Sequence, residues 1–492
     1  MSHEDEGEVD PLGVGLLVAG IGLLLLVGAS GTSLALPPLG DRGWAPPSLP
    51  WRLGGWTVVA LQATGYLLGA ASLWRHVRRP SPLRLRWWHV GLLAVLVLLT
   101  APFGTADHTN YAAYGRILVE GGDPWSVVPA DWRGGADPVV RLVQDPWREA
   151  TSVYGPVGTW LMGLTAWVGG DLARQVVWVW QVLVVAAWLG TRELLVRLGT
   201  PRPTVDRWWT TNVLVLGAGV LGAHVDTLAV CAMAAALGLG LAGRPLLAGL
   251  ATGLAASTKL TAGVVGLALL WGLLSRRGGQ GAPRAGAARL VVGTLLVLVP
   301  AHALVGTHAL GRIAEAGGGI SYAMPWRAVY TLIDLATSEP LARTMTTWVA
   351  ALGCVLLAVA LWRITEGLTE VVAVRALFVL TTAYSLGAGY VLPWYELPQW
   401  LATAVLVGLV GREAWRRLAR LLLLLVGRSL VLALAYVPGR VRLPDDVEMV
   451  TLGFRFVASP LATLAVWVAI WGLWRRAGQH PVRGWSEGGE RI

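Results

Sequence analysis

The chain has 492 residues, of which 55% are hydrophobic and 14% are charged, whereas soluble domains carry roughly 25% charged residues. Apolar runs recur along the whole chain, many of them close to the ~20 residues needed to cross a bilayer as a helix. These runs do not alternate with polar residues, which excludes a membrane β-barrel. The composition predicts an all-α, polytopic membrane protein.

The net charge of +10 does not indicate a nucleic-acid partner. The arginines cluster in short segments between apolar runs, and positive charge in such loops encodes membrane topology. The acidic N-terminus lacks the basic region of a secretory signal, so no cleaved peptide is expected. The two cysteines, Cys231 and Cys354, lie inside apolar runs and suggest neither a disulfide framework nor a metal site.

Three spanning helices are predicted at residues 12–28, 55–74 and 87–103. The arginine-rich segment 75–86 lies between the second and the third, and it places the N-terminus in the cytoplasm. The long polar segment after the third helix is therefore expected outside. The apolar run 156–168 is short, and counting it as a crossing would place the basic segment 192–207 outside. We interpret it as a re-entrant or interfacial helix.

The remaining apolar runs predict paired helices and a second outer loop. Expected helices are 176–188, 208–223, 227–242, 246–256, 260–274, 290–305, 347–362 and 372–389, followed by the last helices between the basic segments 412–420 and 475–476. The second outer loop is expected at 306–344 and a further outer turn at 393–395. This gives ~14 crossings with both termini in the cytoplasm.

The chain is thus divided into four parts. Residues 1–103 form N-terminal transmembrane helices, and residues 104–170 form an extracytoplasmic catalytic loop with the re-entrant helix. Residues 171–478 form the transmembrane core and C-terminal helices, and residues 479–492 form a cytoplasmic tail. We expect a multi-pass protein of the cytoplasmic (inner) membrane with its active site on the extracytoplasmic face.

The segment 104–156 is the predicted site because loops of this length are usually functional or disordered. Its tyrosines and tryptophans, including Tyr111, Trp125 and Tyr154, can form a packed core, which argues against disorder. Asp107 follows the preceding hydrophobic run directly. It could act as a general base, or it could be an interfacial carboxylate near Arg116.

The expected topology collects further polar residues on the outer face, where ionisable side chains at membrane depth suggest function. Lys259, among Ser257, Thr258 and Thr261, could bind a phosphate or pair with Asp226, and we favour the phosphate. His224 and Asp226 could be functional or could satisfy turn amides. Trp394 and Tyr395 fit an aromatic belt as well as a sugar platform.

Arginines on the outer face run against the positive-inside tendency, and this suits anion binding. The arginines concerned are Arg116, Arg327 and Arg343. No third ligand stands at metal-site spacing beside His224 and Asp226, so no metal is expected. The chain also lacks a Walker A motif and a soluble nucleotide domain, which favours a lipid-linked donor over a soluble nucleotide sugar.

Three motifs carry a resemblance to a known family: DHTNYAAYGR (residues 107–116), GGDPW (121–125) and YGP (154–156). They resemble the first outer loop of GT-C-fold integral-membrane glycosyltransferases. The chain is most similar to the polyprenol-phosphate-mannose-dependent α-(1→6)-mannosyltransferases. Trp125 stands where that family has Tyr in its Gly-x-Asp-Pro-Tyr motif.

The resemblance continues in matching order to about residue 401. The family's His-Asn-Asp turn resembles His224-Val225-Asp226, with Val225 in place of Asn. Its lysine after a small-residue helix resembles Lys259, and its Pro-Trp-Tyr resembles Pro393-Trp394-Tyr395. Mannosyl and arabinofuranosyl members of the fold are hard to separate on these motifs.

The resemblance implies inverting transfer of a sugar, with mannose favoured, from a polyprenyl-phosphate donor to a glycan or glycolipid acceptor. Asp107 would be the base. Lys259, Arg116, His224 and Arg327 would bind the donor phosphate and lipid. The residues expected to bind the sugar or acceptor are His108, Tyr111, Asp123, Trp125, Tyr154, Asp226, Trp394 and Tyr395. No cofactor is expected, and the bilayer is itself a partner. The alternatives are a transporter or flippase of a lipid-linked sugar, and a non-catalytic scaffold of an envelope-assembly complex.

Overall fold

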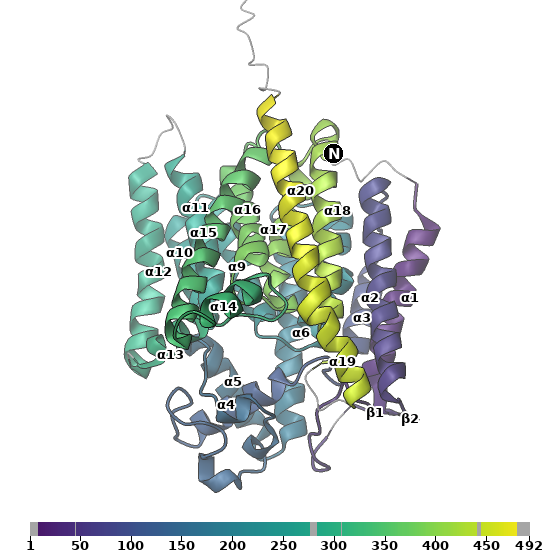
Figure 1. The fold of residues 1–492 in the computed structure, drawn as a ribbon, viewed down its shortest axis with the longest axis vertical. Helices are drawn as coiled ribbons and strands as arrows, with labels where there is room; N and C mark the ends of the chain where they lie inside the picture. The colour runs from purple at the N-terminus through teal and green to yellow at the C-terminus, as the bar shows by residue number, and fades with distance from the viewer. Residues whose placement is uncertain (1–7, 45, 276–282, 307, 440–443, 480–492) are drawn as a thin grey trace, which may run out of the picture.

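A computed structural model describes residues 8–44, 46–275, 283–306, 308–439 and 444–479. Most helices run between two ends of an elongated bundle, drawn vertically in Figure 1. The first half of the bundle consists of α1 (Pro11–Ala29), α2 (Gly55–Arg78), α3 (Trp87–Leu98), α4 (Asp107–Val119), α5 (Pro156–Gly169), α6 (Ala173–Arg197), α7 (Arg202–Val205), α8 (Val213–Val215), α9 (Asp226–Leu241), α10 (Pro245–Thr258) and α11 (Val264–Leu274).

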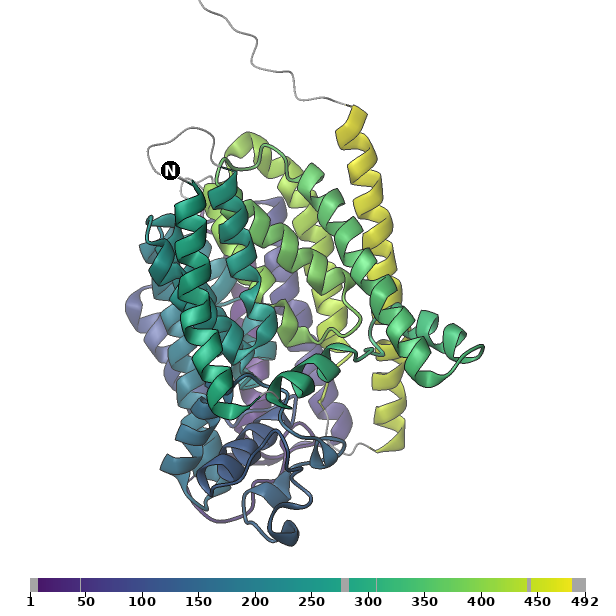
Figure 2. The same cartoon turned by 90° about the vertical axis from the view of Figure 1, so that its left-hand side faces the viewer.

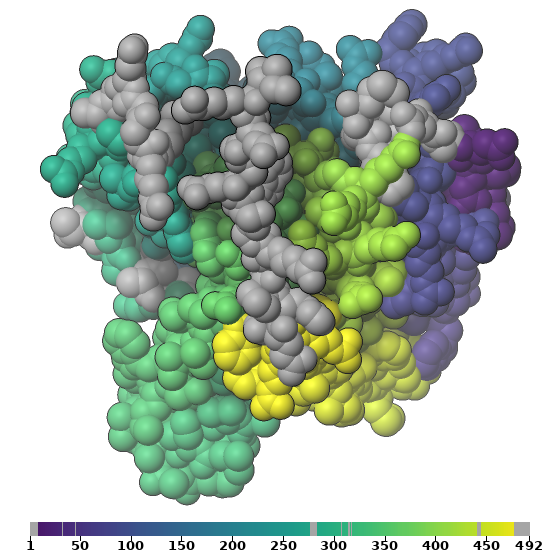
Figure 3. Space-filling view, turned by 90° about the horizontal axis from the view of Figure 1, so that it is seen from above, coloured from purple at the N-terminus to yellow at the C-terminus, as the bar shows by residue number. Residues whose placement is uncertain are grey.

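The second half contains several long helices and two short amphipathic helices, α13 and α14. It consists of α12 (Pro283–Val305), α13 (His308–Gly317), α14 (Trp326–Asp334), α15 (Glu339–Ile364), α16 (Val372–Gly387), α17 (Leu397–Leu409), α18 (Arg412–Leu434), α19 (Asp445–Gly453) and α20 (Ser459–Gln479). In Figure 2 the green segment around α14 and the start of α15 stands out from the bundle, and Figure 3 shows α15 beside α20 at the edge of the molecule.

Short helical turns complete the chain. The 3₁₀ turns are η1 (Trp132–Gly135), η2 (Val140–Leu142), η3 (Trp147–Glu149), η6 (Leu260–Gly263) and η7 (Pro393–Glu396), and the π turns are η4 (Asp206–Thr210), η5 (Leu216–Leu221) and η8 (Phe454–Ala458). One small parallel pair, β1 (Ser30–Thr32) and β2 (Leu49–Arg52), closes the connection between α1 and α2.

Small residues let the helices approach closely, as is usual where lipid removes the hydrophobic drive for association. Between α10 and α12, a Cβ on Gly249 would lie 2.2 Å from the carbonyl oxygen of Leu290. A larger residue at 249 would therefore push these two helices apart. Elsewhere Leu, Val, Ala and Trp side chains fill a continuous core that includes Trp180, Trp188, Trp208 and Trp400.

The all-α, multi-pass character is confirmed. Among the described residues, six helices are long and apolar enough to cross a membrane, or seven if the bent pair Val213–Leu221 and Asp226–Leu241 counts as one span. Four shorter apolar helices add to these: Trp87–Leu98, Pro245–Thr258, Leu260–Leu274 and Val372–Gly387. The count of 14 crossings stays a prediction.

Several expected boundaries were wrong. The third helix ends at Leu98 rather than at residue 103, and the segment after it is not a plain loop, because Asp107 begins the 13-residue helix α4. The helix expected at 208–223 is broken at Thr211 and Asn212 into two pieces with π turns. The outer loop expected at 306–344 contains α13, α14 and the first turns of α15.

The site region lies at one end of the bundle. In Figure 1, α4 and α5 lie at the bottom together with β1, β2, α13 and α19, whereas α20 ends at the top. The basic residues Arg276 and Arg277, which follow the predicted helix 260–274, lie outside the described residues, as does the predicted tail from residue 480.

Candidate active site

Asp107 is held at the start of α4 and is 5% exposed. Its backbone N–H donates to Oγ1 of Thr105 at 3.1 Å. Its Oδ2 lies 3.6 Å from Nδ1 of His224. The hydroxyl of Tyr111, one turn further along α4, lies 3.3 Å from the same nitrogen. Two segments more than 100 residues apart in sequence thus meet at one imidazole.

The His224–Asp226 turn links the π turn η5 to α9, and Asp226 is the first residue of α9. The His224 ring stacks on Trp394 with centroids 3.6 Å apart and planes at 14°. This contact fixes the imidazole between Asp107 on one side and the Pro393-Trp394-Tyr395 turn on the other. Both residues are nearly inaccessible, at 1% and 6% exposed.

Lys259 lies at the break between α10 and η6, as the sequence predicted for a helical pair with Lys259 at its apex. Its Nζ is 2.6 Å from Oδ1 of Asp226 and 3.5 Å from the centroid of the Tyr395 ring. The structure therefore shows the ion pair with Asp226, which was the structural alternative for Lys259. The phosphate role stays a prediction.

The YGP motif places α5 against the end of α10. A Cβ on Gly155 would lie 2.2 Å from the carbonyl oxygen of Ser257, two residues before Lys259. Tyr154 packs edge-on against Tyr111, with ring centroids 5.3 Å apart. Only glycine permits this approach. The motif thereby joins the segment 104–156 to the break between α10 and η6 at Lys259.

Other predicted residues make contacts within the segment 104–156 and with α13. Trp125 is buried and donates from Nε1 to the carbonyl oxygen of Tyr154 at 2.8 Å. Asp123 accepts from Ser126 at 2.6 Å and lies 2.8 Å from Nε2 of His308 on α13. These contacts give Asp123 and Trp125 structural partners, and their predicted contacts with sugar remain predictions.

Arg116 and Arg327 both have partners of their own. Arg116 lies 2.7 Å from Glu120 and 3.3 Å from Asp137. Burial would raise the pKa of the Asp137 carboxyl, but the amides of Val140 and Val139 and the Arg116 guanidinium together lower it below its usual value. Arg327 lies over the rings of Tyr322 and Tyr330, at 4.3 and 5.0 Å from their centroids.

His108 is fully buried on α4, and neither of its ring nitrogens has a hydrogen-bond partner among the described residues. Burial lowers its pKa to about 3, so the ring is neutral at physiological pH. It lies beside the site on a short helix outside the candidate spans.

Two structural supports of the site were missed from the sequence. Trp180 on α6 packs against Tyr111 at 5.1 Å and donates to the carbonyl oxygen of Ala223 at 2.7 Å. Arg428 on α18 pairs with Glu396, directly after Tyr395, where both side chains are buried. An arginine inside the apolar run of α18 was a signal that could have revealed this pair. No such signal marks Trp180, because the chain contains 27 tryptophans and nothing in the sequence distinguishes this one from the others.

No group of three or more His, Cys, Asp or Glu side chains in the described part of the chain could hold a metal ion. The carboxylate, imidazole and ammonium groups instead form pairs, in a setting of Tyr and Trp rings. A narrow cavity adjoins them, lined by Gly104, His224, Trp394 and Tyr436 among others. The expectation of a metal-independent site stays a prediction.

The fold and site define a multi-pass helical membrane protein with a buried polar cluster at one end. A family profile described as "Alpha-(1->6)-mannopyranosyltransferase, N-terminal domain" matches residues 14–275, which is more than half of the chain. The protein therefore belongs to this family, and the resemblance noted in the sequence is confirmed.

Two individual relatives carry the same activity name as the family profile. The chain is 30% identical over 182 residues to "Alpha-(1->6)-mannopyranosyltransferase A" of Mycobacterium tuberculosis, covering 36% of this chain and 34% of that protein. It is 26% identical over 203 residues to the protein of the same name from Corynebacterium glutamicum, covering 39% and 41%. The matched part spans less than half the length of either relative.

Proposed function

We propose that this protein is a membrane mannosyltransferase that moves mannose from a polyprenyl-phosphate donor to a glycan or glycolipid acceptor. The observation that carries the proposal is the buried cluster of Asp107, Tyr111 and His224 at one end of the bundle, within the segment that the family profile matches. The relatives' names favour mannose over arabinofuranose.

In the proposed reaction the acceptor hydroxyl oxygen attacks the anomeric carbon as the bond from that carbon to the donor phosphate oxygen breaks. The configuration is inverted. The hydroxyl proton passes to Asp107, and the phosphate leaves on the polyprenyl chain with the bonding electrons. A lipid phosphate is already a good leaving group, so the site needs a base and cations more than it needs a general acid.

Charge on the leaving phosphate would be stabilised by Lys259 and His224. An ammonium group has three N–H donors, and the contact with Asp226 uses one of them. If Nδ1 of His224 accepts from Tyr111, then Nε2 carries the proton, and this atom has no partner among the described residues. Both groups could donate to phosphate oxygens while the observed pairs stay intact. Arg116 and Arg327 would have to leave their present partners.

The proposal places the protein in the cytoplasmic membrane with both termini inside and the Asp107 cluster outside. The arginine-rich connection between α2 and α3 lies at the opposite end of the bundle from α4 and α5, in keeping with the positive-inside tendency (Figure 1). Donor and acceptor would then meet at the outer surface.

The test is transfer from a short-chain polyprenyl-phosphate-[¹⁴C]mannose to a mannose-containing acceptor by purified protein. We expect Asp107→Asn to lower the rate about 10²–10⁴-fold, as for loss of a positioned base. A folded Asp107→Asn protein with wild-type turnover would exclude Asp107 as the base. Transfer in neither protein, with donor translocation in vesicles, would support the flippase alternative.

Metal removal gives a second test. Since the proposed chemistry uses only side chains of this chain, treatment with EDTA should leave the transfer rate unchanged within error. A rate that EDTA abolishes and that Mg²⁺ or Mn²⁺ restores would contradict this part of the proposal.

A further inference from the structure

A large cavity opens at the same end of the molecule as Asp107 but is formed by different residues. We call it the proline–tryptophan cavity, because its walls come from the connection between α1 and α2, residues 30–44 and 46–48, and from the adjoining ends of α3 and α6. Its volume is about 760 Å³, within the range of small-molecule sites. None of the predicted site residues lines it.

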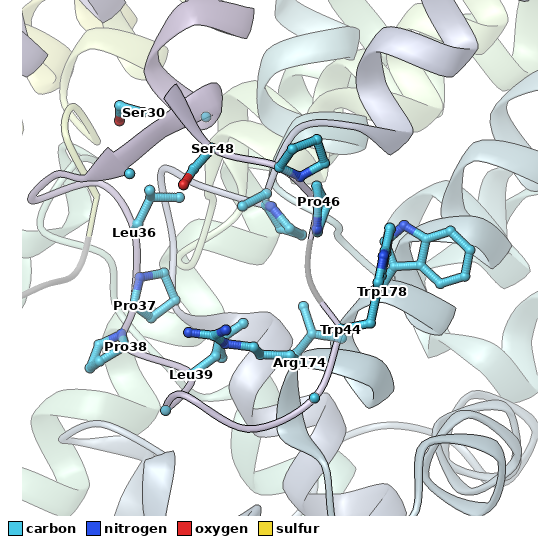
Figure 4. Close-up of a pocket in the computed structure, with 18 of the residues that line it drawn as sticks. Ser30, Leu36, Pro37, Pro38, Leu39, Trp44, Pro46, Ser48, Arg174 and Trp178 are labelled. Carbon is cyan, nitrogen blue, oxygen red and sulfur yellow. The ribbon is translucent and has the colours of Figure 1, made fainter. Parts of the chain in front are cut away.

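The walls are rigid and partly aromatic. Pro37 and Pro38 lie on one side and Pro46 on the other, and proline fixes its own backbone φ angle (Figure 4). Trp44 and Trp178 lie beside Pro46. Their rings pack edge to face, with centroids 4.6 Å apart and planes at 74°. Trp44 is 46% exposed, so much of its indole surface is open to a ligand.

The cavity also holds polar groups suited to hydroxyls. Arg174, in the first turn of α6, extends across the cavity toward Leu39 (Figure 4). It lies 3.7 Å from the exposed carboxylate of Asp41, which offsets part of its charge. The exposed Ser48 is a further donor and acceptor. A lipid tail would prefer an apolar wall throughout, and a phosphate would prefer an unbalanced cation.

A short stretch of chain connects this cavity to the proposed reaction centre. Ala101 and Pro102 line it, and the next residues lead directly to Asp107. The N–H of Gly104 donates to the carbonyl oxygen of Ala35 at 3.1 Å, which ties the cavity wall to this segment. Since Pro102 and Asp107 are five residues apart, their Cα atoms lie at most about 18 Å from each other.

From these observations we propose that the proline–tryptophan cavity binds a neutral, mannose-containing oligosaccharide, namely the part of the acceptor remote from the reacting hydroxyl. The C–H face of a pyranose packs on an indole ring, and its hydroxyls bond to Arg174, to Asp41 and to Ser48. The identification of the sugar as mannose rests on the proposed function. The cavity would extend the site to acceptors that are several sugar units long.

The experiment measures binding and transfer separately. An α-linked mannotetraose is titrated into purified protein in lipid nanodiscs, without donor, and binding is followed by saturation-transfer NMR. The variants are Trp44→Ala and Arg174→Ala. The control is Trp51→Ala, a comparably exposed tryptophan on β2 that does not line the cavity.

We expect Trp44→Ala to weaken tetraose binding by roughly fivefold or more, since a stacked ring contributes about this much. We expect a loss of similar size from Arg174→Ala, because hydrogen bonds from the guanidinium to the sugar hydroxyls are removed. Trp51→Ala should bind as the wild type does. In transfer assays the two cavity variants should raise the KM for the tetraose but leave the KM for a simple mannoside unchanged. Asp107→Asn should still bind the tetraose.

Wild-type tetraose binding in both Trp44→Ala and Arg174→Ala would overturn the proposal, as would displacement of the tetraose by polyprenyl phosphate. An equal loss of transfer to long and short acceptors would overturn it too. Failure of the proposed function gives a different result, because the wild-type protein then transfers no mannose. Tetraose binding to the wild-type protein and its loss in Trp44→Ala would still test the cavity in that case.

Discussion

At the scale of single residues, the buried pair of Lys259 and Asp226 makes the sharpest prediction. The two side chains are 13% and 4% exposed, and removing one leaves the other as an uncompensated charge. We expect Lys259→Met to cost about 3–5 kcal/mol of stability, and the double variant Lys259→Met/Asp226→Asn to recover most of it. Thermal unfolding in detergent measures this.

The same double variant separates stability from donor binding. If Lys259 also contacts the donor phosphate, the restored protein should show a donor KM raised at least about tenfold. A restored protein with wild-type donor KM would limit Lys259 to its ion pair. A melting temperature of Lys259→Met equal to that of the wild type would contradict the stability prediction.

At the scale of helices, Gly155 determines how α5 meets the end of α10. A Cβ there would lie 2.2 Å from the Ser257 carbonyl oxygen, which is too close for any side chain. Gly155→Ala should therefore cost about 1–3 kcal/mol and lower transfer, because the displacement reaches Lys259. Gly91→Ala on α3, where no atom lies within 4 Å, is the matched control. Equal activity of the two variants would show that α5 adjusts freely.

The turns after α4 depend on Asp137. Its lowered pKa means that its charged form stabilises the folded segment at pH values above about 3.9, the usual Asp pKa, and that this stability is lost as the pH falls through the lower folded pKa. Hydrogen exchange of peptides spanning residues 129–142 should stay slow at pH 5. Asp137→Asn should speed this exchange already at pH 7, and equal exchange in both proteins would contradict the assignment.

At the scale of the whole molecule, the arrangement of the two ends predicts which segments face outward. In a protein with Cys231 and Cys354 replaced by alanine, Ser126→Cys should react with a membrane-impermeant maleimide in intact cells. Arg84→Cys, between α2 and α3, should react only after permeabilisation. The reverse pattern would invert the proposed orientation.

Much of this architecture was predictable because membrane helices are encoded by simple apolar runs. The pair around Lys259 and the His224–Asp226 turn were found where the sequence placed them. The start of α4 at Asp107 was missed, because α4 is a polar helix and has no apolar run to mark it. The Lys259–Asp226 pair was one of the two alternatives predicted for Lys259, and Arg428 inside an apolar run was a signal for its pair with Glu396. The contact of Arg116 with Asp137 was beyond prediction from one sequence, since it depends on how the turns after α4 pack.

The stacking of His224 on Trp394 has a consequence for biogenesis. A nascent chain that ends near residue 300 already contains Asp107, His224 and Asp226, but it lacks the indole that holds the imidazole and the phenol that covers Lys259. The turn bearing both rings is in turn anchored by Arg428 on α18. The candidate site is therefore assembled only when α18 has been inserted, so a partly synthesised protein in the membrane still lacks a complete site.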